Sequence, residues 1–451
     1  MLTFEPPMAR QKDSWPNSKL RACWEMLSNY IDTWPKEFYE HDIVECLPHF
    51  PRTYFINDPA FVKFILVNRD QTFGPTWQQE RLTESLFGGK TIASDTHENW
   101  KLDRQMYKAA ASLKGQTDLD SYFLENADRL VSQWAKTGRY QKIDSSISIY
   151  ALKNILRLTL TNVKHENAVI LGNVLSKYRK NIGNISISSI AKQWSYFPAG
   201  LRRGGNKVLQ NAESLLQSEI DDRRGSNEKG CDFLSQYLAQ QKLKGSNVVP
   251  DSRITANALA FVAAGYDTTA SALTWFFYLI GRSQSVQDQI RQEIMPYSET
   301  DRIPSIREVP LTYQAFQETL RLYPPLPLLG REAKRRVVWK GKTYSKHSIF
   351  FISPYVVHRH KSFWPNPNTF DHQRFNAIRK KEILNGSYLP FGFGQRSCIG
   401  VQLTLRELIA AAIKVLPRYR LIVDERHKVK LASGLGLSPK SGIMLKVEPL
   451  G

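Results

Sequence analysis

The chain has 451 residues, of which 42% are hydrophobic and 11% aromatic, so it can form one large domain or two ordinary ones around a substantial core. Lys and Arg number 62 against 42 Asp and Glu, which gives a formal net charge of +20. Such a charge suits an acidic partner, but it suits equally well a basic surface that serves only solubility. No helix-turn-helix, RNA-recognition or zinc-finger pattern accompanies it, so nucleic-acid binding is not expected.

The sequence lacks the signals of an exported or anchored protein. Its N-terminal segment has no apolar stretch, and no later stretch has the roughly 20 uninterrupted apolar residues of a membrane span. The cysteines are scattered without a Cys-x-x-Cys pair, which disfavours a zinc module or a disulfide framework and favours a reducing compartment. We expect a soluble, cytoplasmic monomer. The four cysteines are Cys23, Cys46, Cys231 and Cys398.

In chain order, short extended segments come first and a long, mostly helical part follows. Asp58 can cap the first helix, with Pro59 at its first position. Short β-rich pieces then alternate with Pro/Gly loops, and no linker divides the chain. We expect a mainly α fold with small sheets (α+β), forming a single domain over residues 1–451. The helices are expected at about 58–330 and 400–416, and the strands near 39–57, 335–355 and 420–450.

The segment "HENWKLDR" belongs to a predicted amphipathic helix. Trp100 and Arg104 are four residues apart and share one helical face. Their indole N–H and guanidinium could together bind a carboxylate. The alternative is a half-buried tryptophan beside a solvated arginine.

The segment "AGYDTT" lies in the middle of a long apolar helix over 254–281. Gly265 costs about 1 kcal/mol relative to alanine inside a helix, and Asp267 is costly to bury without partners. A threonine hydroxyl such as that of Thr268 can bend a helix by bonding to the preceding turn. The pattern predicts a local distortion, a groove lined by a carboxylate and a hydroxyl. The alternative is a packing glycine with an incidental polar pair.

The segment "ETLR" ends another amphipathic helix, just before a double proline. Glu318 and Arg321 share one helical face, and "FDHQRF" supplies a second arginine, Arg374. A buried glutamate could bridge both arginines through bidentate hydrogen bonds. Taken alone, however, such a pair occurs on any surface helix.

The segment "PFGFGQRSCIG" frames Cys398 with glycines just before a predicted helix. Gly392, Gly394 and Gly400 permit positive φ angles and close approach by another group. Arg396 and the helix N-terminus both favour a thiolate. The loop is therefore expected to present a stable thiolate, although a buried cysteine in a glycine-rich turn is the simpler alternative.

In their order and spacing, these segments resemble the cytochrome P450 family of haem-thiolate monooxygenases over about residues 50–450. The sequence departs from the family's pattern at His372, where proline is usual, and at Thr404, where alanine is common. "ETLRLYPP" and Arg396 are more similar to the eukaryotic-type branch, yet no membrane anchor or fused reductase is expected. The matching positions are Trp100 and Arg104; Ala264 to Thr269; Glu318, Arg321 and Arg374; and Phe391, Gly394, Arg396, Cys398 and Gly400.

The resemblance implies haem b between the long central helix and the cysteine loop, with Cys398 as the axial iron ligand. Asp267 and Thr268 would organise the O2 site and relay protons. Glu318, Arg321 and Arg374 would form a structural triad. The implied haem contacts are Cys398, Trp100, Arg104, His97, Arg331, Arg396, Phe391, Gly392, Gly400 and Ala264.

The resemblance also implies a reaction that inserts one oxygen atom of O2 into a lipophilic molecule, such as a fatty acid, terpenoid, steroid or other secondary-metabolite-like substrate. NAD(P)H would act only indirectly, through an acidic ferredoxin or flavodoxin-type donor. The basic residues expected to steer that donor are Lys101, Arg379, Lys380 and Lys381. The implied pocket residues, each of which could equally be ordinary core, are Phe261, Ala264, Leu328, Leu329, Leu435 and Leu437.

Two alternatives keep the haem but change the function. One is a peroxygenase driven by hydrogen peroxide, and the other is a non-catalytic haem-binding protein. Peroxygenases of this family tend to lose the acid–alcohol pair, and a mere haem binder needs no proton relay. Asp267 and Thr268 therefore disfavour both alternatives.

Overall fold

The computed structural model describes residues 3–14, 25, 29–46, 52–67, 71–94, 97–111, 118–134, 139–161, 171–172, 206–225, 230–243, 249–434 and 436–450. The chain forms two compact units. The first comprises Met1–Phe73, Asp118–Ala151 and Asp267–Gly451, and the second comprises Gly74–Thr117 and Leu152–Tyr266. Two helices, α6 (Asp144–Thr159) and α10 (Asp251–Arg282), contribute residues to both.

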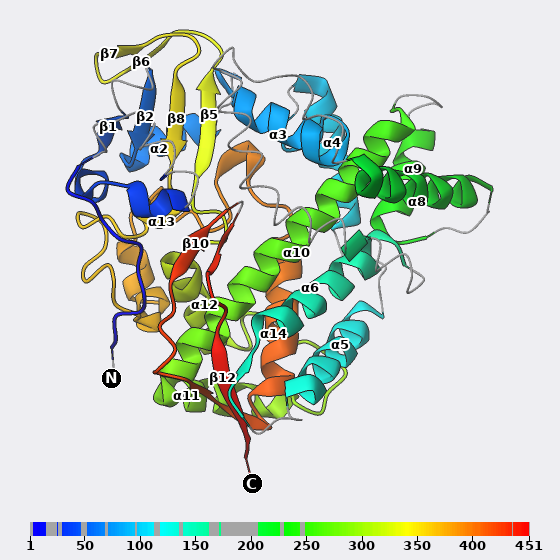
Figure 1. Cartoon of the computed structure of the whole chain (residues 1–451), viewed down its shortest axis with the longest axis vertical. Helices are drawn as coiled ribbons and strands as arrows, with labels where there is room; N and C mark the ends of the chain where they lie inside the picture. Colours follow the sequence, from blue (N-terminus) through cyan, green and yellow to red (C-terminus); the bar gives the residue numbers. More distant parts are fainter. Residues whose placement is uncertain are drawn as a thin grey trace. The chain divides into compact units, whose positions relative to one another are not determined.

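Helices dominate the described residues and the sheets are small, which confirms the predicted fold class (Figure 1). The part of the predicted helical core within 162–170 and 173–205 lies outside the described residues. The remaining helices are α2 (Pro59–Val67), α3 (Trp77–Phe87), α4 (His97–Ala110), α5 (Leu119–Trp134), α8 (Asn206–Gly225), α9 (Phe233–Leu243), α11 (Gln284–Ile294), α12 (Pro310–Leu322), α13 (Pro354–Val357) and α14 (Val401–Val415).

The largest described sheet has the strand order β1-β2-β8-β5-β3. Strands β2 and β8 are parallel, whereas β1–β2 and β5–β8 are antiparallel. Its strands are β1 (Ile43–Glu45), β2 (Thr53–Ile56), β3 (Phe73–Gly74), β5 (Leu329–Ala333) and β8 (Ile349–Ile352). The smaller sheets pair β6 (Val337–Trp339) with β7 (Lys342–Tyr344), β10 (Leu431–Ser433) with β11 (Leu437–Pro439), and β12 (Met444–Pro449) with β4 (Gln141–Lys142) and β9 (Tyr419–Val423).

Helix α2 packs against the sheet that contains β2 and β8. Asp58 caps it as predicted, since its Oδ1 accepts hydrogen bonds from the amides of Ala60 (2.9 Å) and Phe61 (3.2 Å). The Phe61 ring stacks on Trp339 with centroids 4.7 Å apart, inside a core shared with β2 and β8. The C-terminal end of α2 is therefore a rigid support for any loop that packs on it.

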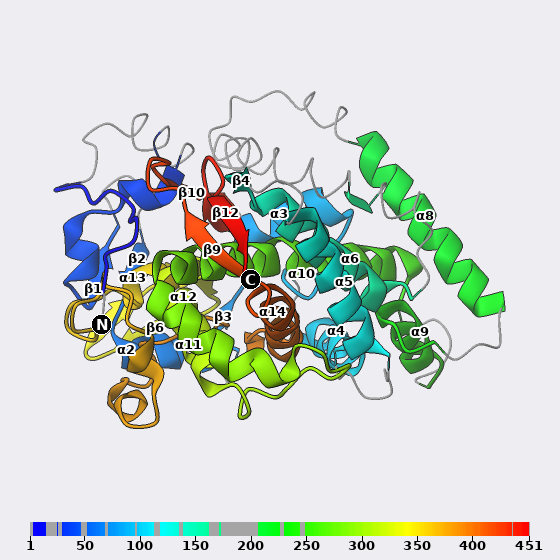
Figure 2. The same cartoon turned by 90° about the horizontal axis from the view of Figure 1, so that it is seen from below.

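The helices of the first unit that precede and follow the cysteine loop are deeply buried. Every residue of α12 from Ala315 to Leu322 is buried, as is most of α14. Helices α5 and α14 lie side by side (Figure 2). In the C-terminal half of α10, Trp275 stacks on Tyr323 with centroids 3.9 Å apart. Burial and these contacts hold α12, α14 and the C-terminal half of α10 in place.

The second unit has an aromatic core of its own. The ring of Phe233, from α9, lies 4.5 Å from that of Phe261 in α10 and 4.9 Å from that of Tyr107 in α4. All three side chains are buried. This core packs α4, α9 and the N-terminal half of α10 together.

Candidate functional site

The loop before α14 presents Cys398 at the surface. Cys398 is exposed, and its backbone amide donates a 2.8 Å hydrogen bond to the carbonyl of Phe391. Helix α14 begins at Val401, so the cysteine precedes a helix N-terminus as predicted. Gly392 and Gly394 have φ angles of 69° and 72°. Gly400 is different: its φ is −82°, so it does not use the positive φ that a glycine permits.

Gly394 allows the cysteine loop to touch α2. A Cβ at this position would lie 2.3 Å from the carbonyl oxygen of Leu66, in the last turn of α2. Gly394 therefore lets this loop contact the backbone of a supporting helix.

Gly394→Ala should destabilise the first unit more than Gly341→Ala does. Both glycines have φ angles near the left-handed region (72° and 79°), where alanine costs about 1–2 kcal/mol. Only at Gly394 does the new methyl also meet a backbone atom, which should add about 1–3 kcal/mol of overpacking. Nothing described lies within 4 Å of a Cβ at Gly341. Urea unfolding of the two variants tests this, and equal losses would contradict it.

Arg331, on β5, is a partly buried cation. Burial lowers the pKa of its guanidinium to about 10. Its Nη1 donates to the carbonyl of Gly330 (2.8 Å), and no carboxylate in the described ranges forms an ion pair with it. Arg396, in the short 3-10 helix Gly394–Arg396, is partly buried. An anionic group beside Arg331 would be favoured, because it would compensate a charge that is partly removed from water.

Trp100 and Arg104 share a face of α4, as predicted. Both are partly buried, and the Arg104 guanidinium lies 5.9 Å from the centroid of the Trp100 ring. They belong to the second unit, whereas Arg331, Arg396 and Cys398 belong to the first. The side chain of His97 lies outside the described residues.

Residues 263–268 form an accessible stretch in an otherwise buried part of α10. Residues 254–262 and 269–281 are buried, whereas 263–268 are partly or fully exposed, with Ala264 the most open. The helix is unbroken from Asp251 to Arg282, so the predicted distortion does not take the form of a helix break. A Cβ at Gly265 would lie 2.5 Å from Cδ1 of Ile155, so this glycine is explained by packing. The polar pair Asp267–Thr268 is partly exposed.

The turn between β10 and β11 lies beside Asp267. A Cβ at Gly436 would be 3.3 Å from Oδ2 of Asp267. The turn is held to α10 because Ser271 Oγ and Trp275 Nε1 both donate to the carbonyl of Leu437, the latter at 3.2 Å. The Asp267 carboxylate therefore lies beside a hairpin that is hydrogen-bonded to the same helix.

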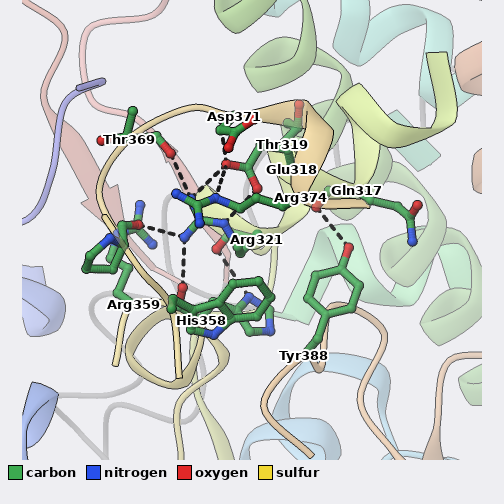
Figure 3. Close-up of polar contacts among 12 residues, drawn as sticks. Gln317, Glu318, Thr319, Arg321, His358, Arg359, Thr369, Asp371, Arg374 and Tyr388 are labelled. Atoms are coloured by element: carbon green, nitrogen blue, oxygen red, sulfur yellow. Dashed lines mark hydrogen bonds and ion pairs between the residues drawn. The ribbon is translucent and has the colours of Figure 1, made fainter. Parts of the chain in front are cut away.

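Glu318, Arg321 and Arg374 meet in a buried cluster (Figure 3). Arg321 Nε and Nη2 donate to the two carboxylate oxygens of Glu318 at 2.7 and 2.8 Å, and both side chains are 0% exposed. Arg374 Nε lies 3.4 Å from Glu318 Oε1. His372 does not prevent this contact, because residues His372–Phe375 form a 3-10 helix that places Arg374 over the glutamate.

His358 links this cluster to the cysteine loop, a role that the sequence reasoning missed. Its Nε2 accepts a 2.7 Å hydrogen bond from the amide of Leu389, so Nδ1 carries the proton and donates to the carbonyl of Arg321 (3.2 Å). Burial, together with the nearby Arg321 charge, lowers the pKa of His358 to about 3. A histidine in the segment "VVHRH" was the available signal, but its partners are distant in sequence.

His358 should make the folded protein less stable in acid. In the unfolded chain a histidine titrates near pH 6.5, whereas the folded state holds His358 neutral down to about pH 3. The contribution of His358 to the free energy of unfolding is therefore complete above about pH 6.5. It is lost as the pH falls, by up to about 1.4 kcal/mol per pH unit. The free energy of unfolding in urea, followed from about pH 6.5 to 5, should show a shallower slope for His358→Gln. Identical slopes would contradict this.

The six pocket candidates divide by accessibility. Phe261 is buried in the aromatic core of the second unit, and Leu437 is fully buried. Ala264, Leu328 and Leu329 are at least partly exposed. Leu435 lies outside the described residues.

The basic residues expected to meet an electron donor are accessible. Lys101, Lys380 and Lys381 are exposed. Arg379 is partly buried and forms an ion pair with Asp371 at 2.8 Å. Among the helices that the structure describes, none has both the length and the apolar character of a membrane span.

Comparison with known proteins identifies related sequences. A family model described as Cytochrome P450 matches residues 15–447. Cyclooctatin synthase of Streptomyces melanosporofaciens is 34% identical over 258 residues, covering 56% of this chain and 54% of that protein. Taurochenodeoxycholic 6 alpha-hydroxylase of Sus scrofa is 28% identical over 249 residues, covering 54% of this chain and 49% of that protein. The matched regions thus span about half the length of these relatives.

Solved structures share the fold. Retinoic acid bound cyanobacterial CYP120A1 superimposes with a TM-score of 0.76 at 20% identity, over 88% of this chain and 89% of that chain. The heme domain of a cytochrome P450DA mutant gives a TM-score of 0.75 at 22% identity, over 88% of each chain. At these identities the likeness shows the fold alone.

Proposed function

The chain belongs to the cytochrome P450 family, and from this premise we propose that it is a haem-dependent monooxygenase acting on a lipophilic small molecule. The observation that carries the proposal is the exposed Cys398, held by a glycine loop at the N-terminus of α14. We also propose one domain over residues 1–451, because the family match spans nearly the whole chain. The cytoplasm is the proposed compartment, since scattered cysteines suit a reducing environment.

The residues present fit haem b. Cys398 would be the axial ligand, with Phe391, Gly392, Gly400 and Ala264 beside the ring. When bound, the haem supplies the oxidising chemistry, and a thiolate ligand favours O–O cleavage. Arg331 supports the fit, because it is a partly buried guanidinium that forms no ion pair with a carboxylate among the described residues. The propionate partners would be Arg331, Arg396, Trp100 and Arg104, with His97 as a further candidate.

Asp267 and Thr268 would hold and deliver protons where O2 binds. They lie in the accessible stretch of α10, and the hairpin at Gly436 lies beside the Asp267 carboxylate. This pair favours a monooxygenase over a peroxide-driven enzyme or a simple haem carrier, neither of which requires proton delivery to O2.

Thr268→Ala should retain haem but form less product per electron consumed. Loss of the hydroxyl removes a proton donor from the O2 site, and general acid–base groups typically contribute about 10²–10⁴-fold. Thr269→Ala is the control, because Thr269 is buried beside the accessible stretch. The measurement is the ratio of product to NAD(P)H consumed in a reconstituted assay. Unchanged coupling in Thr268→Ala would contradict the relay.

The proposed substrate is a lipophilic molecule of the fatty acid, terpenoid or steroid type. Ala264, Leu328 and Leu329 offer accessible apolar surface, as pockets for such molecules require. A relative named as a 6 alpha-hydroxylase supports hydroxylation as the reaction type.

The proposed electron donor is an acidic ferredoxin or flavodoxin-type protein, itself reduced at the expense of NAD(P)H. Lys380 and Lys381 are accessible, and the net charge of +20 would attract such a protein. Lys101 and Arg379 would add to the attraction. Association should weaken as salt rises, because surface charges are screened.

The test is the absorbance spectrum of the dithionite-reduced protein under carbon monoxide. A Soret band at the long wavelength given by thiolate ligation is expected. A band at the position of histidine-ligated or thiol-ligated haem, or no haem at all in a folded preparation, would overturn the proposal. Spin-state shifts on addition of a panel of lipophiles would then narrow the substrate.

A further inference from the structure

A buried carboxylate, Asp103, connects α4 to its neighbours in the second unit. Asp103 is 0% exposed. Its Oδ1 accepts hydrogen bonds from Tyr237 Oη of α9 (2.7 Å) and Arg253 Nε of α10 (3.3 Å), and its Oδ2 accepts from Arg253 Nη2 (2.6 Å). One side chain therefore joins three helices through a charge-assisted, bidentate contact.

A second contact lies one turn further along α4. Tyr107 Oη donates to the carbonyl of Asn257 on α10 at 2.7 Å. The Asn257 side chain in turn accepts from the amide of Ile92 (3.1 Å) and donates to the carbonyl of Arg253 (3.1 Å). Because Asp103 and Tyr107 are four residues apart, both contacts act on the same face of α4.

These two contacts set the rotation of α4 about its axis. Arg104 follows Asp103 directly, so its side chain lies about 100° further around the helix. Trp100 shares that second face with Arg104. If the Asp103 face is held on α9 and α10, the Trp100–Arg104 face can point in only one direction.

We propose that Asp103 is a positioning residue, whose contacts with Arg253 and Tyr237 orient Trp100 and Arg104 to receive the carboxylates of the haem. This inference rests on the proposed function, since it assumes that haem is bound. It assigns a role to a residue inside the segment "HENWKLDR" whose partners are supplied by α9 and α10. Asp103 itself touches no part of the haem in this proposal.

The test compares Asp103→Asn with a matched control, Asp232→Asn. Asp232 is also buried in the second unit (3% exposed) and pairs with an arginine, since Arg223 Nη2 lies 3.0 Å from its Oδ2. Its other hydrogen bonds come from Thr161 and Ser235, not from α4. Both variants should lose stability, so only a haem-specific readout separates positioning from folding.

The readouts are the rate of haem loss to an excess of apomyoglobin and the haem reduction potential. Asp103→Asn should lose haem about 10- to 100-fold faster than wild type, the range typical of losing a residue that orients a ligand. Its reduction potential should shift, and Asp232→Asn should match wild type in both readouts. Asp103→Glu should recover part of the effect. Equal haem loss in wild type and Asp103→Asn, or equal acceleration in both Asn variants, would overturn the proposal.

Tyr107→Phe keeps the proposal testable if Asp103→Asn does not fold. It removes only the hydroxyl that bonds Asn257 and keeps the ring that packs on Phe233. A smaller but measurable acceleration of haem loss is expected, and none would overturn the proposal. A wild-type protein without the thiolate band would overturn both the proposed function and this inference. If the wild-type protein shows the thiolate band but these variants lose haem at the wild-type rate, only the inference about Asp103 is overturned.

Discussion

Glu318→Gln is expected to destabilise the folded protein by about 3–5 kcal/mol, because it leaves Arg321 as a buried charge without its carboxylate. Both groups are 0% exposed, and two guanidinium nitrogens of Arg321 bind Glu318. Its remaining nitrogen already donates to the carbonyl of His358 at 2.9 Å (Figure 3) and to that of Pro367 at 2.6 Å. No described anion remains to replace the lost carboxylate.

The matched control for this prediction is Glu308→Gln. Arg302 and Glu308 also form a bidentate contact, through Nη1 (3.0 Å) and Nη2 (2.9 Å) of Arg302, but at the protein surface. Solvent screens an exposed pair, so its loss should change stability little. The measurement is the free energy of unfolding in urea for both variants at equal haem occupancy. Comparable losses in the two variants would contradict a special role for the buried cluster.

Local spacing was enough to predict the parts of the site that lie on one element. The Glu318–Arg321 contact follows from helical geometry, and so does the shared face of Trp100 and Arg104. The helix after Cys398 was visible as an apolar periodicity. In each case the informative residues are no more than about one helical turn apart.

Features that depend on distant residues could not be predicted in this way. Gly265 exists because Ile155 packs on it, and Gly394 exists because the carbonyl of Leu66 lies against it. Asp103 pairs with Arg253, which is 150 positions away. Nothing in the sequence around such a residue specifies its partner, so an isolated glycine or aspartate has several possible explanations.

Residues 263–268 of α10 differ from the rest of the helix core in being accessible to solvent. A helix of 32 residues that is buried on either side of positions 263–268 would normally be filled with apolar side chains there as well. The accessible residues instead include a carboxylate and a hydroxyl. Packing explains Gly265. For Asp267 and Thr268 we propose the oxygen chemistry described above.

Cys398→Ala is expected to abolish the thiolate band of the reduced carbon monoxide complex and monooxygenase turnover with it. The substitution should leave the loop intact, because the hydrogen bond to the carbonyl of Phe391 comes from the backbone amide. A loss of the band would therefore report the missing sulfur and not a collapsed loop.

Cys231→Ala is the control for Cys398→Ala, since Cys231 is also exposed but lies just before α9 in the second unit. It should retain both the band and turnover. Comparable far-ultraviolet circular dichroism of the two variants would establish that both are folded. Persistence of the band in Cys398→Ala would rule out Cys398 as the ligand, and its loss in Cys231→Ala would assign the thiolate to the other unit. Only an unchanged Cys231→Ala together with a lost band in Cys398→Ala fits a site built on the loop before α14, where the glycines, Arg396 and the helix N-terminus all favour a thiolate.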